Sequence, residues 1–297
     1  MGWDELRGTA PAADGYELAI TRFTPQETPW ATMLFAGAMG VRQDFYAPLA
    51  RYFAERGVHV LTFDYRGQGW SRPKRLAALD ATVSDWAEKD MNAMLAQARN
   101  AAPHLPLTLM GHSLGGQILG IVPANADVRA AINVTAASGW YRYNDRIPIR
   151  VRIVWFLAMP LLTPLFGYFP GKRLRMVGDL PKGVADQWRR WCLHPEYVLS
   201  EGPRARAAFD RVTAPILSFS FDDDDIITRP AVESLNGFYR NARVEHRHVA
   251  PADIGAKRIG HFGFFSERSR PNLWAQSVEW LRAQVPAARK TALAQPV

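Results

Sequence analysis

The sequence predicts an α/β fold in which helices cover both faces of a mostly parallel sheet. Short apolar runs alternate with amphipathic segments of helical spacing along most of the 297 residues. One apolar run ends abruptly in a Gly-rich turn at residues 111–115, and a helix-like segment follows it. Residues 138–214 break the alternation, so they are predicted to be a helical insertion over the ends of the strands.

The predicted strands are apolar runs bounded by turn residues, and the predicted helices place their apolar residues on one face. Strands are expected at residues 16–24, 30–35, 58–63, 105–110, 130–136, 215–221 and 243–249. Helices are expected at residues 43–56, 84–101, 230–239 and 271–284, with another from the Gly-rich turn to about residue 123. Gly57 is expected to end the first helix, and Thr82 or Ser84 to cap the second.

The positive charge of the chain is concentrated in the insertion. The chain has 36 Lys and Arg against 28 Asp and Glu, a net charge of +8, and residues 138–214 hold 13 of the basic and 6 of the acidic residues. No zinc-finger or RNP-type motif accompanies this excess, so we expect a solvated basic surface and no nucleic-acid partner. The single cysteine, Cys192, excludes an intramolecular disulfide and a cysteine-based metal cluster. Residues 1–13 contain no apolar leader, which predicts a cytoplasmic protein.

The Gly-rich turn, Gly111-His-Ser113-Leu-Gly115, is a Gly-x-Ser-x-Gly motif between a predicted strand and a predicted helix. This context is typical of a nucleophile elbow, a sharp turn on which a serine occupies a strained backbone conformation. Glycines flank the serine because residues without a Cβ let the neighbouring chain approach closely. A chance match in a Gly- and Ser-containing turn is the alternative, and the motifs elsewhere in the chain argue against it.

The insertion contains the most apolar stretch of the chain, residues 153–169, interrupted by Pro160 and Pro164. Its length is near the lower limit for crossing a bilayer. Basic residues flank it at both ends: Arg150, Arg152, Lys172 and Arg173. We therefore favour a pair of lid helices facing a pocket, and contact between this lid and a membrane is the alternative.

The resulting domain organisation has a core in two parts, residues 1–137 and 214–285, with a helical cap at residues 138–213. Residues 286–297 are expected to form a loose tail. The residues expected to line the substrate pocket are Trp155, Phe156, Met159 and Leu162, within an apolar set that also includes Leu157, Leu161, Leu165 and Phe166.

The motifs and their order resemble the α/β-hydrolase superfamily with a cap domain, over residues 16–284. More narrowly, Gly111-His-Ser-Leu-Gly-Gly-Gln117 together with Ile259-Gly-His-Phe-Gly-Phe-Phe265 resembles a little-characterised bacterial group of predicted α/β hydrolases. The resemblance implies an eight-stranded type of sheet, with the cap inserted before the strand that carries the catalytic acid. It also implies the chain order nucleophile, acid, histidine. The segment Asp64-Tyr-Arg-Gly-Gln-Gly-Trp-Ser71 matches a structural turn of the superfamily.

The resemblance implies a catalytic triad of Ser113, Asp224 and His261. Phe221-Asp-Asp-Asp-Asp-Ile-Ile227 fits the acid motif Gly-x-x-Asp-x-x-Val with Asp224 as the acid. Phe221 replaces the usual glycine, so Asp223 is the alternative. His261 lies on the loop beyond the strand at residues 243–249, where the superfamily places its base.

The resemblance also places an oxyanion hole at two backbone N–H groups. One belongs to Leu114, the residue after the nucleophile. The other comes from the loop Gly37-Ala38-Met39-Gly40, where Met39 is the expected donor and Ala38 the alternative.

Together these residues predict a serine hydrolase that acts through an acyl-enzyme on a carboxylic ester or thioester with an apolar acyl or aromatic part. The partner is thus a small-molecule ester, and no metal or organic cofactor is expected. A peptidase or amidase, a carbon–carbon bond hydrolase using the same triad, and a non-catalytic ligand-binding fold are the alternatives.

Overall fold

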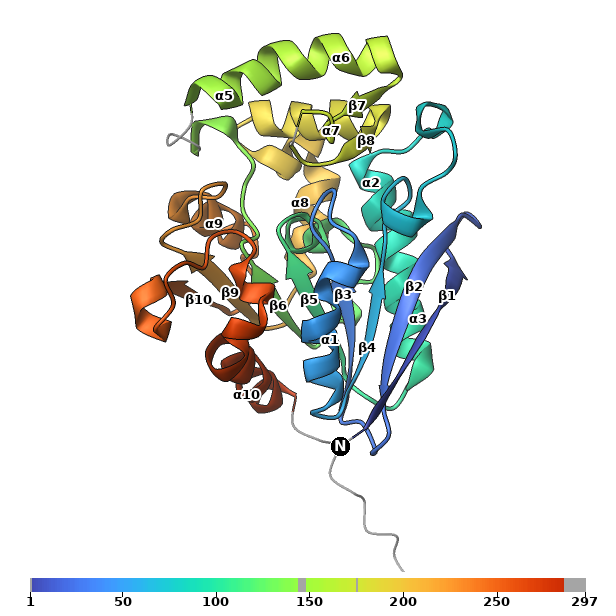
Figure 1. Ribbon diagram of the computed structural model, residues 1–297, viewed down its shortest axis with the longest axis vertical. Helices are drawn as coiled ribbons and strands as arrows, with labels where there is room; N and C mark the ends of the chain where they lie inside the picture. The colour runs from blue at the N-terminus through green and yellow to red at the C-terminus, as the bar shows by residue number, and fades with distance from the viewer. Residues whose placement is uncertain (1, 144–147, 175, 286–297) are drawn as a thin grey trace, which may run out of the picture.

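An eight-stranded sheet runs through the molecule in the order β1-β2-β4-β3-β5-β6-β9-β10 (Figure 1). The computed structural model describes residues 2–143, 148–174 and 176–285. The pairs β1–β2 and β2–β4 are antiparallel, and the other neighbours are parallel. The strands of this sheet are β1 (Trp3–Pro11), β2 (Glu17–Pro25), β3 (Ala31–Ala36), β4 (Val58–Phe63), β5 (Leu107–His112), β6 (Ala130–Val134), β9 (Ile216–Phe221) and β10 (Val244–Val249). The predicted mostly parallel sheet is confirmed.

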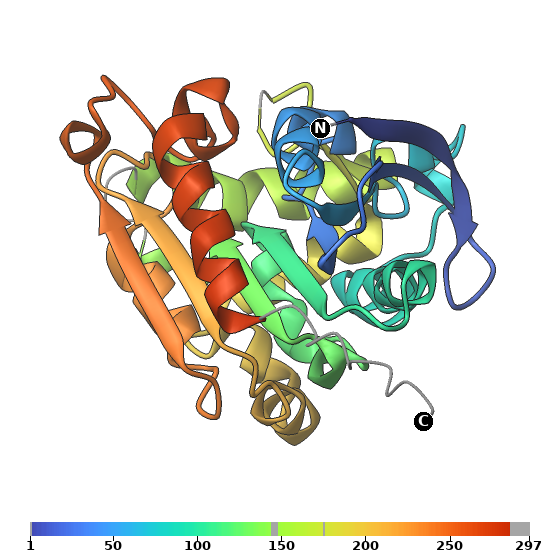
Figure 2. The same ribbon diagram turned by 90° about the horizontal axis from the view of Figure 1, so that it is seen from below.

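Helices cover both faces of the sheet, as Figure 2 shows. Helices α1 and α10 share one apolar cluster with Met33 and Phe35 of β3, whereas α3 and α8 belong to the cluster that contains Leu34 and Ala36. Successive residues of a strand point to opposite faces, so β3 contributes to both clusters. The helices are α1 (Ala47–Ala54), α2 (Val83–Asp85), α3 (Asn92–Ala101), α4 (Leu114–Gln117), α5 (Pro148–Ile153), α6 (Met159–Phe166), α7 (Lys182–Leu193), α8 (Pro203–Asp210), α9 (Arg229–Asn236) and α10 (Ala275–Gln284).

Several element ends differ from the sequence-based expectation. Strand β1 was not expected, because it is an edge strand with most of its side chains exposed and therefore lacks a clear apolar alternation. The long helix expected at residues 84–101 begins one residue earlier, at Val83, and Thr82, one of the two expected caps, forms a capping box with Asp85. The helix after the Gly-rich turn ends at Gln117, and a short 3₁₀ turn, Leu119–Ile121, takes its place.

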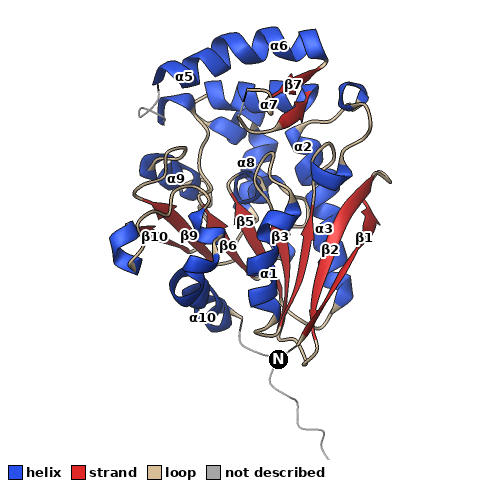
Figure 3. Ribbon diagram, viewed as in Figure 1, coloured by secondary structure: helices blue, strands red, loops and turns tan. Residues whose placement is uncertain are grey.

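Most of the insertion lies above the carboxyl ends of the sheet strands (Figures 1 and 3). A π-helical turn, Val154–Ala158, joins α5 to α6, and a two-stranded sheet of β7 (Tyr168–Pro170) and β8 (Asp179–Pro181) follows. Helix α8 instead packs beside the 3₁₀ turn at Leu119–Ile121. We keep residues 138–213 as a proposed cap and call them the inserted segment. The expected tail at residues 286–297 lies outside the described residues.

None of the helices in the described part of the chain combines the length and the apolar character needed to cross a membrane.

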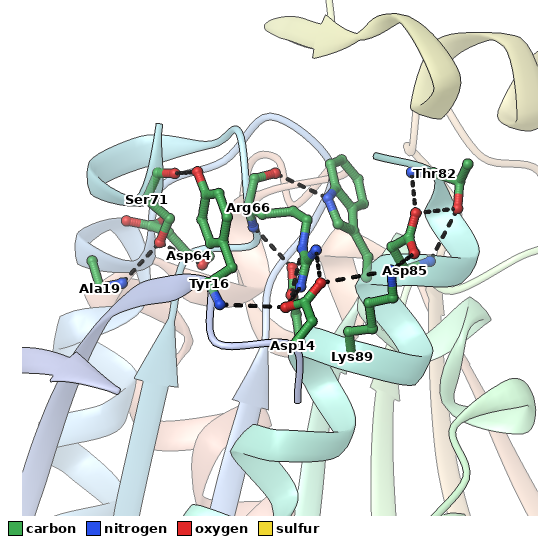
Figure 4. A network of polar contacts seen from close by, with 11 residues as sticks. Asp14, Tyr16, Ala19, Asp64, Arg66, Ser71, Thr82, Asp85 and Lys89 are labelled. Carbon is green, nitrogen blue, oxygen red and sulfur yellow. Dashed lines mark hydrogen bonds and ion pairs between the residues drawn. The ribbon is translucent and has the colours of Figure 1, made fainter. Parts of the chain in front are cut away.

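A buried ion-pair network anchors the turn that follows β4 (Figure 4). The Arg66 side chain is 4% exposed and donates hydrogen bonds to Asp90, at 2.7 Å, and to both oxygens of Asp14, at 2.7 and 2.8 Å. The hydrogen bonds from Arg66 lower the pKa of Asp14 below its usual range. Burial has the larger effect on Asp90 and raises its pKa to about 6.

The same turn reaches the loop after β3. The Asp64 carboxylate accepts backbone N–H bonds from Gln43 at 2.8 Å and from Trp70 at 2.9 Å. Gln68 accepts the backbone N–H of Gly40 at 3.2 Å. The network in Figure 4 holds the turn after β4, and that turn holds the loop expected to carry an oxyanion donor.

Candidate active site

Ser113 occupies a backbone conformation that few residues with a side chain adopt. It lies between β5 and α4 with φ 48° and ψ −111°. Such a conformation costs about 1–3 kcal/mol and persists only where the surroundings hold it. Here the Ser113 N–H donates to Val134 O at 2.9 Å, and the Ser113 carbonyl accepts N–H bonds from Gly116 and Gln117, both at 3.1 Å. The strained turn places the serine side chain at the end of β5, as expected of a nucleophile elbow.

The two motif glycines are required by close contacts. A Cβ at Gly115 would lie 2.1 Å from Ala36 O, and a Cβ at Gly111 would lie 2.6 Å from the Cα of Gly116. Any side chain at either position would push α4 away from β3 or from β5. The Gly-x-Ser-x-Gly spacing thus reflects the packing of the elbow.

His261 and Asp224 form a buried hydrogen-bonded pair. His261 Nδ1 lies 2.9 Å from Asp224 Oδ2, and the two side chains are 4% and 1% exposed. The other carboxylate oxygen, Oδ1, accepts the backbone N–H groups of Ile226 and Ile227 at 2.8 and 2.9 Å. With its Nδ1 bonded to the carboxylate, the imidazole keeps Nε2 for a proton from the nucleophile.

Asp223, the alternative acid, contacts a different part of the histidine loop. Its oxygens accept the backbone N–H groups of Ile259 and Gly260, both at 2.9 Å. It therefore holds the loop that carries His261 but does not bond the imidazole. This geometry favours Asp224 as the acid and gives Asp223 a supporting position.

The histidine loop is tied to the elbow through His112. Within the described part of the chain no hydrogen bond joins Ser113 Oγ to His261 Nε2, a contact that often tightens only when substrate binds. Instead, His112 Nε2 lies 3.2 Å from the backbone oxygen of His261, and the two rings are 5.1 Å apart. Since a carbonyl only accepts, His112 donates this bond from Nε2 and its Nδ1 is left as an acceptor.

A tyrosine continues this chain of hydrogen bonds to the loop after β3. The Tyr46 hydroxyl donates to His112 Nδ1 at 2.9 Å and accepts the backbone N–H of Ala38 at 2.7 Å. Burial, followed by the nearby His261, lowers the pKa of His112 well below its usual range, and burial raises the pKa of Tyr46. Both side chains therefore stay neutral near pH 7, as this arrangement of donors and acceptors requires.

In the loop after β3, the backbone N–H groups on either side of Met39 donate hydrogen bonds, and among the described residues that of Met39 does not. Ala38 donates to Tyr46, and Gly40 donates to Gln68 at 3.2 Å. No acceptor for the Met39 N–H is found among the described residues. The geometry therefore favours Met39 over Ala38 as an oxyanion donor.

Leu114 supplies the other N–H expected at the oxyanion hole. It is the first residue of α4, where a backbone N–H has no acceptor within the helix. It directly follows Ser113, so its N–H lies beside the serine side chain.

Two of the four expected pocket residues point inward. Trp155 and Met159 are 7% and 1% exposed and belong to the same apolar cluster as Met39. Leu162 is half-buried. Phe156 is 54% exposed and points outward, so its expected place in the pocket is corrected. It follows Trp155 by one residue in the π-helical turn, so the two side chains leave the helix in different directions.

The family model described as "Serine aminopeptidase, S33" matches residues 27–176, half of the chain, including the elbow and the loop after β3. The chain belongs to this family. The resemblance to the α/β-hydrolase superfamily is thereby confirmed, and with it the prediction of a hydrolase.

Curated relatives of this S33 family member include two lipases. A monoacylglycerol lipase of Mycolicibacterium smegmatis is 30% identical over 105 residues, which cover 35% of this chain and 36% of the lipase. A monoglyceride lipase of Homo sapiens is 30% identical over 106 residues, 36% of this chain and 34% of the lipase. The matched region thus spans about a third of each relative.

Solved structures share the fold over nearly the whole chain. A carboxyl esterase of Bacillus coagulans has a TM-score of 0.59 at 15% identity and covers 96% of this chain and 99% of its own. The esterase Pf2001 of Pyrococcus furiosus has a TM-score of 0.61 at 12% identity, covering 95% and 91%. At these identities the likeness shows the α/β-hydrolase fold alone.

The S33 family member also contains a second serine next to histidines. Ser220 Oγ lies 2.8 Å from His246 Nε2 and 2.7 Å from His248 Nδ1. Ser220 is 3% exposed and its backbone lies within β9 in a regular strand, so it lacks the half-buried, strained position of Ser113. His246 and His248 lie two residues apart on one face of β10, and both contact the buried serine of the neighbouring strand.

A cavity of about 440 Å³ lies on the outer side of the acid loop. Its walls include Arg142, Arg229 and His248. None of the proposed triad or oxyanion residues lines it, so we do not assign it to the substrate.

Sequence reasoning did not identify Tyr46 as part of the site. Its role depends on a hydroxyl that meets Ala38 and His112, which are 8 and 66 residues away in the chain. No local motif surrounds it. Its burial, which only the structure shows, is what points to a role, because a buried phenol normally finds a hydrogen-bond partner.

Replacing Tyr46 by phenylalanine should weaken both the fold and the site. The variant leaves the Ala38 N–H and His112 Nδ1 without partners in a buried region, so we expect a loss of about 1–3 kcal/mol in the free energy of unfolding. A displaced Met39 N–H should lower kcat roughly 10- to 100-fold with a smaller change in KM. Urea unfolding and ester kinetics measure the two effects.

Tyr52→Phe is the matched control. Tyr52 is also buried, on α1, and no hydrogen bond of its hydroxyl is found among the described residues. A Tyr46→Phe variant that behaves like this control would show that the hydrogen-bond chain does not support the site.

Proposed function

We propose that this hydrolase cleaves carboxylic esters or thioesters through an acyl-enzyme on Ser113. The observation that carries the proposal is the buried hydrogen bond of 2.9 Å between His261 Nδ1 and Asp224. It orients an imidazole on a loop that His112 ties to the strained nucleophile elbow. Nucleophile, base and orienting acid are the three groups that acyl transfer of this kind needs.

In the proposed mechanism Ser113 Oγ attacks the carbonyl carbon of the substrate while His261 Nε2 takes the serine proton. Asp224 stabilises the resulting imidazolium. The carbonyl oxygen becomes an oxyanion that accepts hydrogen bonds from the N–H groups of Leu114 and Met39, each contributing about 3 kcal/mol.

The tetrahedral intermediate then collapses. The bond from the carbonyl carbon to the leaving oxygen or sulfur breaks, and His261 returns its proton to that atom. Water, deprotonated by His261, then attacks the acyl carbon. The bond from that carbon to Ser113 Oγ breaks, His261 returns the proton to Oγ, and the carboxylic acid leaves. Burial of the imidazole among apolar and aromatic groups strengthens these electrostatic interactions.

The substrate is proposed to carry an apolar acyl part. Support comes from Trp155 and Met159, which are buried and belong to the large apolar cluster that also contains Met39. The two curated relatives are lipases that by name act on monoacylglycerols. A fatty-acyl monoester of glycerol is therefore the first natural ester to test.

Aminopeptidase activity, which the family's description suggests, has less support from the inserted segment. An aminopeptidase pairs the substrate ammonium group with a carboxylate near the pocket. Four of the five acidic residues that the structure describes in this segment already have basic partners: Asp179 with Arg72, Asp186 with Lys182, Glu201 with Arg190 and Asp210 with Arg240. The fifth, Glu196, is exposed.

The test compares kcat/KM for p-nitrophenyl esters of increasing acyl length, a monoacylglycerol, an acyl thioester and an aminoacyl p-nitroanilide. One methylene in an apolar pocket is worth about 1–3 kcal/mol, so lengthening a short acyl chain by one or two methylenes should raise kcat/KM about tenfold or more. The anilide should be the poorest substrate. Preference for the anilide, or no dependence on acyl length, would contradict the proposed substrate class.

A further inference from the structure

The outer face of the inserted segment exposes a continuous row of large apolar side chains. We call these residues of α5, the π-helical turn and α6 the apolar stripe: Ile149, Ile153, Phe156, Leu157, Leu161, Leu165 and Phe166. Ile149 and Leu165, near the two ends, are 73% and 74% exposed. Steps of three or four residues separate successive members or pairs, so the stripe follows one side of a helix.

The stripe is distinct from the face that packs on the protein. Trp155, Met159 and Thr163 are 7%, 1% and 0% exposed and lie four residues apart. They bury the inner side of the same helices. Figure 1 shows α5 and α6 as the outermost layer at the top of the molecule, and no other labelled element lies above them. A contiguous exposed apolar face of this size marks an interaction surface.

Basic side chains lie along the stripe. Arg152 is exposed within α5, near the start of the stripe. Near its middle, Arg142 lies 5.9 Å from the ring of Tyr141, which contacts Phe156. At its far end, Arg173 lies 5.4 Å from the ring of Phe166.

The chain around the stripe is strongly cationic as a whole. Residues 138–178 contain seven Lys and Arg and one acidic residue. An apolar helix face bordered by cationic groups is the combination that places a helix in the plane of a membrane surface.

We propose that the apolar stripe docks this protein on a bilayer surface that contains anionic lipids. The helical run of residues 148–166 is roughly 28 Å long, and it would lie parallel to the bilayer with its apolar side chains below the headgroups. The basic groups along it would then meet lipid phosphates.

A second copy of this chain fits the surface less well. A symmetric pair formed through the stripe would bring the same cationic segment of each copy face to face. Like charges in proximity oppose association, whereas anionic headgroups complement them. Charge thus favours the bilayer as the occupant.

The docking surface is independent of the proposed chemistry, since Ser113 and His261 take no part in it. The sequence favoured a lid facing a pocket, with membrane contact as the alternative. The exposure of Phe156 and Leu165 instead favours the alternative for the outer face. The inner face packs on α7, where the Trp155 ring lies 4.7 Å from that of Trp188, and the outer face is exposed.

Co-sedimentation of the full chain with lipid vesicles tests the proposal. We expect binding to vesicles of phosphatidylcholine with phosphatidylglycerol, weaker binding to phosphatidylcholine alone, and a roughly tenfold loss of affinity for the mixed vesicles when the salt is raised from about 0.05 to 0.5 M. The double variant Phe156→Asp/Leu165→Asp should lose at least tenfold in affinity, because binding would carry two charges below the lipid headgroups. Arg152→Glu/Arg173→Glu should weaken binding to the mixed vesicles only.

Leu6→Asp is the matched control, since Leu6 is 63% exposed on β1, far from the stripe. All variants carry exposed substitutions, so circular dichroism and the melting temperature should stay unchanged. Absence of binding to the mixed vesicles at low salt overturns the proposal, as does equal loss for Leu6→Asp and the stripe variant. Concentration-dependent dimers that the stripe variant abolishes, without vesicle binding, would assign the surface to a second copy instead.

Discussion

Replacing Ser113 by alanine will lower kcat for an ester substrate by about 10⁵-fold and leave the melting temperature nearly unchanged. The variant removes the attacking oxygen, and the residual rate comes from binding and the oxyanion donors alone. Alanine fits the space of serine. Both residues carry a Cβ, so the strain of the positive φ of 48° is the same in the two proteins. Steady-state kinetics and thermal unfolding measure the two parts of the prediction.

A fluorophosphonate probe adds a readout that needs no substrate. It should label the wild-type chain once, at Ser113, and fail to label Ser113→Ala in intact-mass spectra. Ser220→Ala is the matched control, because Ser220 also lies within hydrogen-bond distance of histidines, at 2.8 and 2.7 Å. We expect this control to be labelled like the wild type.

The opposite pattern would reassign the chemistry. Labelling that disappears in Ser220→Ala and persists in Ser113→Ala would move the nucleophile to β9. A folded wild type that neither reacts with the probe nor hydrolyses any ester would favour the non-catalytic binding fold.

The sheet was predictable because its strands are short and apolar and are bounded by turns. Strands such as β4 and β9 are buried on both faces, so a continuous apolar run marks them in the sequence. Strand β1 has no such mark, because it lies at the edge of the sheet and faces solvent along most of its length. Its position depends on its pairing with β2, which is a tertiary contact.

Hydrophobic periodicity could not predict which side of the apolar stripe's helices is buried. Residues 153–169 are apolar almost throughout, so the sequence has no polar side from which to infer which face is buried. Trp155 and Phe156 are equally apolar, yet one is buried and the other exposed. Only the packing of this helical run on the rest of the inserted segment decides which of the two is buried.

The site was predictable where chemistry is local and unpredictable where it is not. Ser113 and His261 sit in short motifs whose glycines reflect close packing. The choice between Asp223 and Asp224 depends on contacts with residues 36 and 37 positions later in the chain. Neighbouring aspartates on a turn cannot be separated by spacing alone.

Asp224→Asn is expected to reduce kcat by roughly 10³- to 10⁴-fold, or about 4–5.5 kcal/mol, with little change in KM. The amide keeps the N–H bonds that Asp224 Oδ1 accepts from Ile226 and Ile227, so the acid loop should stay folded. It no longer supplies a negative charge, and its NH₂ group favours the imidazole tautomer with Nε2 protonated. That nitrogen can then no longer take the proton of Ser113.

Asp223→Asn should behave differently, because its two oxygens each accept one backbone N–H. One of those N–H groups, from Ile259 or Gly260, would face the NH₂ of the new amide, at a cost of about 1–3 kcal/mol in the free energy of unfolding. Turnover should fall by only about tenfold, through the mobility of the loop that carries His261. Comparing kcat with urea unfolding for both variants therefore separates an orienting carboxylate from a supporting one. If folded Asp223→Asn loses more turnover than Asp224→Asn, the acid is Asp223, and the hydrogen bond at 2.9 Å to Asp224 is structural.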